Sequence, residues 1–249
     1  MKDFSKLEAI IGIKFKNINL LKQAVVHRSY INEHPNFELG HNERLEFLGD
    51  AVLEIIVTEY LYHHYPNMTE GDLTSIRASL VNSKMLYQVA CKINLEDFLF
   101  LSRGEAKDKN SKAKQYIVAN AVEALIGAIY LDQGIKAAKK FVNKFILCEA
   151  DYIVSNQLYL DPKSTFQEKA QEKFKITPHY RVLKETGPDH AKTFEVGLYI
   201  NDELIARGIG TSKQEAQVEA ARKGLIKKGW IKKTQKTKIK YLDKIKKNG

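Results

Sequence analysis

The first part of the chain carries apolar residues spaced three and four positions apart, from Leu7 to Tyr152. The spacing is clear in the segments LLKQAVVH, RLEFLGDAVLEIIVTEYL, RASLVNSKMLYQVACKI and AVEALIGAIYL. Because an α-helix repeats every 3.6 residues, this pattern predicts a bundle of helices joined by short polar connections. Thr69 followed by Asp72 is typical of a capping box and predicts the start of one of these helices.

The pattern changes after a junction at Ser155–Pro162. A helical segment, STFQEKAQEKF, is followed by HYRVLKE, FEVGLYI and ELIARGI, in which apolar and polar residues alternate as they do in β-strands. Ser212 is a suitable N-cap for a closing helix that ends near Lys228, which gives the order α-β-β-β-α. We therefore predict three parts: an all-helical domain at 1–155, a small α-β-β-β-α domain at 161–230 and a tail at 231–249.

Charge follows a similar division. The chain has 249 residues with 40 Lys plus Arg against 30 Asp plus Glu, a formal net charge of +10. Residues 1–155 are neutral overall, residues 156–230 carry a net charge of +3, and residues 231–249 carry +7. A positive excess concentrated near the C-terminus suits a polyanionic partner, either nucleic acid or an anionic membrane surface.

A membrane partner is disfavoured by the apolar pattern. The most apolar run, Ile117–Leu131, has 15 residues and contains Asn120 and Glu123, whereas a spanning helix needs about 20 apolar residues. The N-terminal residues lack the basic-then-apolar build of a signal peptide. Cys91 and Cys148 lie far apart without CxxC spacing, so we expect two buried, reduced thiols in a cytoplasmic protein.

Acidic residues form a stripe on the helix predicted for ERLEFLGDAVLEIIVTEYL. The stripe has the spacing i, i+3, i+7 and i+11 and consists of Glu43, Glu46, Asp50 and Glu54. The other positions are mostly apolar, which is typical of a buried helix. Because burying like charges without partners costs several kcal/mol, we expect a cationic group against this stripe.

A second core-like helix, predicted within Ile117–Leu131, carries Asn120 and Glu123 at i and i+3. If the two helices face each other, these residues share one pocket with Glu46 and Asp50. Oxygen ligands of this kind suit Mg²⁺, which polarises a phosphodiester and activates water. The alternative is a surface stripe on one helix and a buried ion pair on the other, and the spacing alone favours that alternative.

The residues themselves resemble the bacterial ribonuclease III family. Asn42–Val52, NERLEFLGDAV, is similar to the signature segment of that family. Further segments occur in the family's order: HRSYINE (His27–Glu33), EGDLTSIRASLV (Glu70–Val81), RGE (Arg103–Glu105) and VEALIGAIYLDQG (Val122–Gly134). The resemblance covers nearly the whole chain and implies an all-α endonuclease domain followed by an α-β-β-β-α double-stranded-RNA-binding domain.

The resemblance implies a cytoplasmic, homodimeric endoribonuclease that hydrolyses phosphodiester bonds in double-stranded RNA. It implies Mg²⁺ as the cofactor, with Mn²⁺ as a substitute, and neither a membrane partner nor a small-molecule cofactor. The implied products have 5′-phosphates, 3′-hydroxyls and two-nucleotide 3′ overhangs. The implied substrates are precursors of ribosomal RNA and some messenger and transfer RNAs.

The resemblance also assigns roles to single residues. Asp50 and Glu123 match the positions most directly involved in catalysis, and Glu43 and Glu70 match acidic residues that shape the processing centre. Phe47 matches an aromatic residue that inserts into the partner subunit. The implied metal ligands are Glu46, Asp50, Asn120 and Glu123.

Asn120 departs from the family pattern, which usually has Asp at this position. An amide oxygen still coordinates Mg²⁺ but brings no charge, so we expect weaker metal binding rather than loss of cleavage. The alternative is a catalytically weakened or inactive protein that only binds double-stranded RNA.

The α-β-β-β-α segment carries five candidate RNA contacts. Gln167 and Gln171, at i and i+4, suit 2′-hydroxyl contacts in a minor groove, although a solvated helix face explains them more simply when they are taken alone. His190 matches a second minor-groove contact. Ser212 and Lys213 begin the last helix, where free N–H groups favour phosphate. The family prefers two or three basic residues there, so weaker binding is expected.

Two further features of the C-terminal part are its Lys-rich tail and the small residues of its last helix. We expect residues 231–249 to be disordered and to add non-specific attraction for phosphate. Small residues of the last helix are interpreted as structural, letting it lie close to the sheet: Ala216, Ala220, Ala221 and Gly224.

Overall fold

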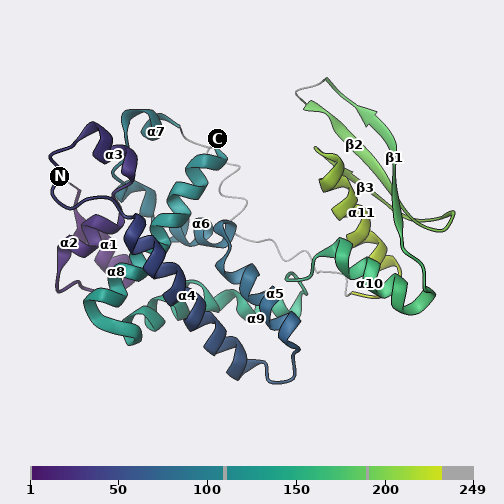
Figure 1. Ribbon diagram of the computed structural model, residues 1–249, viewed down its shortest axis with the longest axis horizontal. Helices are drawn as coiled ribbons and strands as arrows, with labels where there is room; N and C mark the ends of the chain where they lie inside the picture. Colours follow the sequence, from purple (N-terminus) through teal and green to yellow (C-terminus); the bar gives the residue numbers. More distant parts are fainter. Residues whose placement is uncertain (1, 109–110, 189–190, 232–249) are drawn as a thin grey trace. The chain divides into compact units, whose positions relative to one another are not determined.

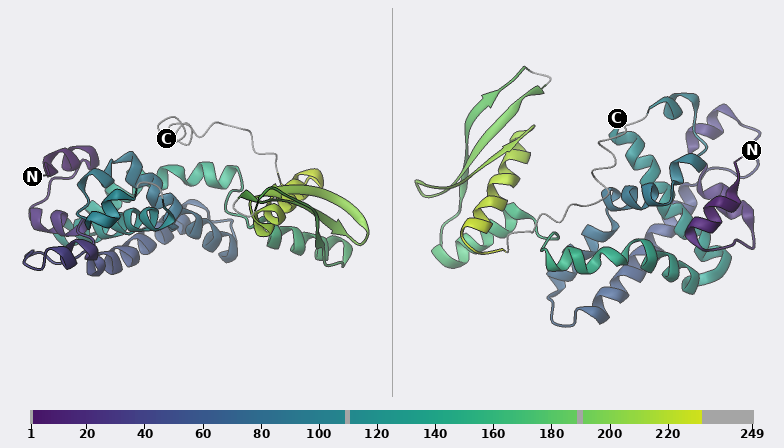
Figure 2. Two further views of the ribbon diagram at one scale, coloured as in Figure 1. Left: turned by 90° about the horizontal axis from the view of Figure 1, so that it is seen from above. Right: turned by 180° about the vertical axis from the view of Figure 1, so that it is seen from behind.

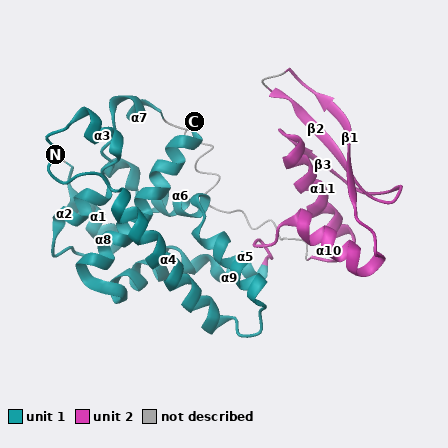
Figure 3. Cartoon of the chain, viewed as in Figure 1, with its two compact units in different colours: residues 1–155 teal, residues 156–249 magenta. Residues whose placement is uncertain are grey.

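The computed structural model describes residues 2–108, 111–188 and 191–231. The chain divides into two compact units, residues 1–155 and 156–249 (Figure 3), and each is described by itself. The first unit is helical, as predicted (Figure 1). Its helices are α1 Phe4–Ile11, α2 Ile18–Ala24, α3 Arg28–Glu33, α4 Glu43–His64, α5 Glu70–Val81, α6 Ser83–Lys92, α7 Arg103–Lys107, α8 Lys112–Phe145 and α9 Ala150–Ser155, with 3₁₀ turns η1 Leu95–Phe98 and η2 Leu147–Glu149.

Side-chain caps explain where several of these helices begin. Thr69 Oγ1 accepts a hydrogen bond of 3.2 Å from the backbone N–H of Asp72, so the predicted capping pair is confirmed at the start of α5. Asn82, Ser102 and Ser111 accept equivalent bonds at the starts of α6, α7 and α8. Each bond satisfies a backbone donor that the helix itself leaves unpaired.

Helices α4 and α8 lie at the centre of the unit and cross with their backbones in contact (Figures 1 and 2). A Cβ atom added to Gly49 of α4 would collide with the backbone of Glu123, and one added to Gly127 of α8 would collide with the backbone of Leu45. Leu53 of α4 and Leu125 of α8 are both fully buried. Two glycines therefore set how closely the two helices approach.

Gly134 interrupts α8 and ends its straight first part. Its backbone has φ 75° and ψ −175°, a conformation that glycine adopts without the penalty that a side chain would bring. The preceding Asp132 accepts hydrogen bonds from the backbone N–H groups of Lys16 and Asn17, at 2.9 and 2.8 Å. These bonds tie the bend to the segment just before α2.

The second unit is an antiparallel sheet of order β1-β2-β3 with two helices on one face (Figures 1 and 2). Phe166 of the first helix, Leu198 and Ile205 of the sheet and Leu225 of the last helix form its core. The predicted α-β-β-β-α order is confirmed. The elements are α10 Pro162–Phe174, β1 His179–Thr186, β2 Thr193–Ile200, β3 Glu203–Gly210 and α11 Lys213–Lys227.

Small residues hold α11 close to the sheet. A Cβ atom at Gly208 of β3 would collide with the backbone of α11, and one at Gly224 would lie 2.7 Å from a methyl carbon of Leu198. The structural interpretation of the small residues is confirmed for Gly224 and for three fully buried alanines: Ala216, Ala220 and Ala221.

The expectation of two buried thiols was wrong, because Cys91 and Cys148 are both exposed. In α6 the buried positions are Met85, Leu86, Val89 and Ala90, so Cys91 falls on the outer side of that helix. No helix within the described residues is long and apolar enough to cross a membrane.

Candidate functional site

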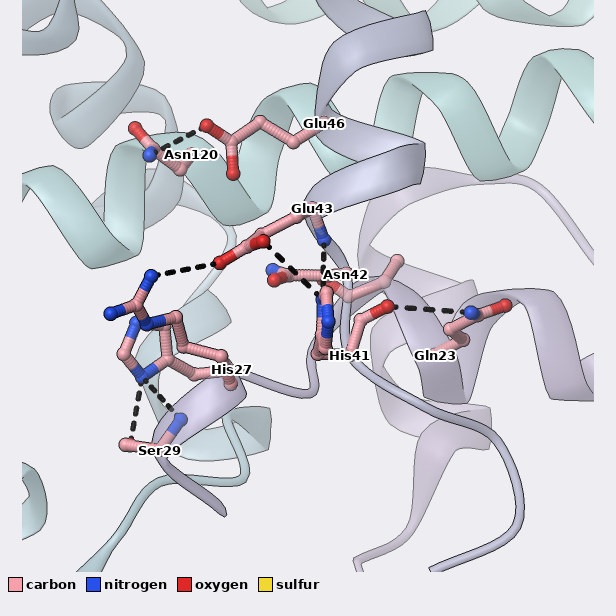
Figure 4. A network of polar contacts seen from close by, with 10 residues as sticks. Gln23, His27, Ser29, His41, Asn42, Glu43, Glu46 and Asn120 are labelled. Atoms are coloured by element: carbon pink, nitrogen blue, oxygen red, sulfur yellow. Dashed lines mark hydrogen bonds and ion pairs between the residues drawn. The ribbon is translucent and has the colours of Figure 1, made fainter. Parts of the chain in front are cut away.

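The crossing of α4 and α8 brings the predicted metal ligands of the two helices together. Asn120 Nδ2 donates a hydrogen bond of 2.7 Å to Glu46 Oε1 (Figure 4). Glu123 lies about one turn further along α8, and Asp50 lies about one turn further along α4. Residues separated by more than 70 positions in the chain thus form one polar cluster, which we call the acidic cluster: Glu46, Asp50, Asn120 and Glu123.

The carboxylates of the acidic cluster repel one another. Burial raises the pKa of Glu123 to about 8, and the charges of Asp50 and Glu46 add to the increase. Burial also raises the pKa of Glu46, with further contributions from Glu43 and Asp50. Glu54, which is exposed two helical turns beyond Glu46, does not contribute to either shift. The charged forms of Glu46 and Glu123 are therefore disfavoured in the protein alone.

The cationic group that was expected beside the acidic stripe is missing at its centre among the described residues. In the described part of the chain, no Lys, Arg or His forms an ion pair with Glu46, Asp50 or Glu123. Partly buried carboxylates with no counter-charge are costly, and a bound cation would remove that cost. The alternative of a single buried ion pair on α8 is contradicted, because Glu123 has no basic partner among the described residues.

Glu43 belongs to the acidic stripe and lies just before Glu46, at the edge of the acidic cluster. Of the stripe carboxylates, it is the only one with basic neighbours within the described ranges. Arg28 Nη1 lies 3.5 Å from Glu43 Oε1, and His41 Nδ1 lies 3.8 Å from Glu43 Oε2 (Figure 4). The start of α4 is anchored by Asn42, which is buried and donates from its amide to the carbonyl of Ala24 at 3.1 Å. This bond fixes the position from which Glu43 and Glu46 project.

The segments HRSYINE and RGE meet beside this edge. His27 Nδ1 accepts a hydrogen bond from the backbone N–H of Ser29 and starts α3 (Figure 4). The backbone N–H of Ser102 donates to Ser29 Oγ at 3.1 Å, and that of Arg103 donates to the Glu33 carboxylate, also at 3.1 Å. These bonds hold α3, and with it Arg28, against the segment that leads into α7.

The donor set of the acidic cluster suits a hard divalent cation such as Mg²⁺. Carboxylate and amide oxygens are the ligands it prefers, and Mg²⁺ keeps several waters and substrate oxygens in its coordination sphere. Among the described residues, no three His, Cys, Asp or Glu side chains are close enough to hold an ion by themselves. A cation here would therefore need the Asn120 oxygen, water and substrate oxygens to complete its coordination.

Two other predicted residues lie outside the acidic cluster. Glu70 begins α5 and lines a separate pocket of about 380 Å³ together with Thr58 and Tyr62 of α4. Thr58 is 12 residues from Glu46, or about 18 Å along the helix, so one chain does not bring Glu70 to the cluster. Phe47 points outward from α4 with 82% of its surface exposed, and Tyr62 is also largely exposed on that helix.

The second unit carries its predicted RNA contacts on exposed elements. Gln167 and Gln171 are both exposed on α10, and Gln171 Nε2 donates to Thr177 Oγ1 at 3.3 Å. Ser212 Oγ caps α11 by accepting from the backbone N–H of Glu215. Lys213 Nζ lies 3.1 Å from Glu185 Oε1 on β1. His190 and residues 232–249 of the predicted tail lie outside the described residues.

Both units match known families. Residues 17–150 match the family described as ribonuclease-III-like, and residues 162–228 match the double-stranded RNA binding motif. The chain belongs to the ribonuclease III family. Ribonuclease 3 of Carboxydothermus hydrogenoformans is 47% identical over 219 residues, which cover 88% of this chain and 93% of that protein. Ribonuclease 3 of Dehalococcoides mccartyi strain 195 is 43% identical over 225 residues, which cover 90% of this chain and 94% of that protein.

A solved structure agrees with the family assignment. The nuclease domain of ribonuclease III from Campylobacter jejuni is 39% identical and matches with a TM-score of 0.52, over 61% of this chain and 97% of that one. The resemblance drawn from the sequence is therefore confirmed, and the chain is an endoribonuclease with a double-stranded-RNA-binding domain. The alternative of a protein that only binds RNA gains no support from these relatives.

Several residues that position the acidic cluster of this ribonuclease III family member were not predicted from its sequence. Gly49 and Gly127 set the helix crossing, Asn42 anchors the start of α4, and Arg28 faces Glu43. One signal was available for the glycines, because each lies three or four residues from a polar residue of an otherwise apolar helix. No comparable signal exists for Arg28, whose contact with Glu43 depends on the loop between α3 and α4.

Proposed function

We propose that the chain cleaves double-stranded RNA at the acidic cluster with Mg²⁺, for which Mn²⁺ can substitute. The proposed products have 5′-phosphates, 3′-hydroxyls and two-nucleotide 3′ overhangs. The proposed natural substrates are precursors of ribosomal RNA and some messenger and transfer RNAs, and a cytoplasmic location stays a prediction. The observation that carries the proposal is the group of partly buried carboxylates for which the described residues supply no counter-charge.

The proposed roles follow from where each side chain lies. Glu46, Asp50, Glu123 and the Asn120 oxygen would hold the cation, which, when bound, polarises the scissile phosphodiester and lowers the pKa of water. Burial on the α4–α8 crossing keeps Glu46 and Glu123 in place. Glu43, paired with Arg28, is proposed to shape the edge of the centre.

Cleavage of a long RNA duplex tests this proposal. We expect fragments to accumulate with Mg²⁺ and not with EDTA, whereas the same sequence as single strands or as duplex DNA stays intact. End-group analysis should find 5′-phosphates and 3′-hydroxyls, and mapping of both strands should find two-nucleotide 3′ overhangs. Binding of the duplex without cleavage at any Mg²⁺ or Mn²⁺ concentration would instead establish the alternative of an inactive RNA-binding protein.

Exposed apolar residues of α4 support a homodimer. Phe47, Ile55 and Tyr62 lie within about 80° of one another around the helix axis, and all are largely exposed. The pocket beside Tyr62 is large enough to accept an aromatic side chain from a second copy. A structure of the Campylobacter jejuni nuclease domain, with a TM-score of 0.51, is described as showing flexibility in a region involved in dimer formation.

Phe47→Ala is expected to weaken this homodimer about 10²- to 10⁴-fold, because a buried Phe contributes about 1.5–3 kcal/mol to an interface and the dimer loses one from each copy. Analytical ultracentrifugation over a concentration series measures the dissociation constant. Leu131→Ala is the matched control, since it removes an exposed apolar side chain from α8. Equal dissociation constants for both variants and the unchanged chain would contradict the role of Phe47.

Glu185→Gln is expected to increase affinity for duplex RNA about 2- to 5-fold, because it frees Lys213 from an exposed ion pair of the kind worth at most about 1 kcal/mol. Fluorescence anisotropy with a labelled duplex, at two salt concentrations, measures the change. Glu203→Gln is the matched control, because it makes the same charge change at the Lys228 pair. If both variants gain equally, net charge explains the effect and the Lys213 contact does not.

A further inference from the structure

Asn120 makes a contact that an aspartate at this position could not make in its charged form. The amide Nδ2 donates to Glu46 Oε1 at 2.7 Å, and a carboxylate accepts hydrogen bonds but donates none. The orientation of the Asn120 amide is therefore determined by its partner. Oδ1 stays available on the same side chain.

Position 120 also decides how many charges the acidic cluster contains. Glu46 and Glu123 are partly buried and repel each other, and the exposed Asp50 repels both. A carboxylate at 120 would place a further negative charge within hydrogen-bond distance of Glu46. With Asn120, the same contact becomes attractive, and a hydrogen bond to a charged acceptor is stronger than one between neutral groups.

We propose that Asn120 is a positioning residue that fixes the Glu46 carboxylate and keeps the metal-free centre folded, in exchange for weaker cation binding. The inference rests on the proposed function, because it concerns the same cation site. Loss of one ligand charge lowers cation affinity, since charge count is one of the features that tune such sites. The chain would therefore need a higher Mg²⁺ concentration than its Asn120→Asp variant.

Thermal unfolding in EDTA and in a MgCl₂ series tests the inference without measuring cleavage. In EDTA, Asn120→Asp is expected to unfold about 3–6 °C lower than the unchanged chain, because it adds a repelling charge. In Mg²⁺ it should gain more in melting temperature, with a titration midpoint about 10-fold lower. Asn143→Asp, an exposed change on the same helix, should match the unchanged chain.

The double variant Glu46→Gln with Asn120→Asp, which exchanges the two functional groups, separates positioning from simple packing. The amide introduced on α4 can then donate to the carboxylate introduced on α8, so both the hydrogen bond and the number of charges are restored. We expect this double variant to recover most of the melting temperature that Asn120→Asp loses in EDTA. Asn120→Ala, which removes the bond without adding charge, should lose stability and also bind Mg²⁺ no more tightly than the unchanged chain.

Failure of this inference and failure of the proposed function give different results. If Mg²⁺ raises the melting temperature of the unchanged chain, but Asn120→Asp is as stable as that chain in EDTA, the positioning inference is wrong and the proposed function stands. A double variant no more stable than Asn120→Asp would also overturn it. If Mg²⁺ shifts no variant at all, the cation site of the proposed function is wrong, and the inference falls with it.

Discussion

Glu123→Gln is expected to reduce cleavage of double-stranded RNA by about 10³-fold or more while making the metal-free protein more stable. Glutamine keeps the shape of the side chain but removes a negative charge that a divalent cation would need. The same charge is costly when no cation is bound, because burial and the charges of Asp50 and Glu46 raise the pKa of Glu123 to about 8. Function and stability should therefore change in opposite directions.

The expected gain in stability is about 1–2 kcal/mol at neutral pH, less than the full pKa shift implies because solvent screens part of the repulsion. Thermal unfolding in EDTA measures this gain, and a gel assay on a long duplex measures cleavage. Glu54→Gln is the matched control, because Glu54 is exposed on α4 and contributes to neither raised pKa. An active Glu123→Gln variant, or one that loses stability in EDTA, would contradict the role given to Glu123.

Gly49→Ala should have the second large effect, a loss of about 3 kcal/mol in the free energy of unfolding together with loss of cleavage. The added Cβ would collide with the backbone of Glu123, so α4 and α8 would have to move apart. Any such movement separates Glu46 from Asn120. The atoms that the added Cβ would meet belong to the backbone, so no flexible side chain can move aside to relieve the contact.

Denaturant unfolding measures the cost of Gly49→Ala. Gly71→Ala is its control, since Gly71 lies on α5 and its nearest atom, Thr69 Oγ1, would be 3.9 Å from the added Cβ. That control should be neutral or slightly stabilising, because alanine favours a helix more than glycine does. If the two variants have the same stability, the close crossing of α4 and α8 is not what holds the centre together.

The fold class could be predicted from the sequence because its signals are local. Helical spacing and the Thr69 cap predicted the first unit, and strand alternation predicted the sheet of the second. Residue spacing also placed Glu46 and Asn120 on two core-like helices, and those helices meet. In these cases, residues near one another in the chain carry the information.

The remaining features depend on contacts between distant residues. Spacing did not reveal that Asn120 donates to Glu46, or that Lys213 pairs with Glu185, because both contacts depend on how separate elements pack. Composition suggested buried cysteines, yet Cys91 lies just outside the apolar face of α6. Glu70 was grouped with the catalytic residues, but within one chain it lines a different pocket.

Direct measurement of cation binding tests the central claim that the acidic cluster holds the divalent ion. Mn²⁺ can be titrated into the full chain and into Glu123→Gln, and free Mn²⁺ followed by electron paramagnetic resonance without any RNA. We predict saturable binding to the unchanged chain and an affinity at least about 10-fold lower for Glu123→Gln, with Glu54→Gln unchanged. Equal Mn²⁺ binding by Glu123→Gln and the unchanged chain would contradict the account.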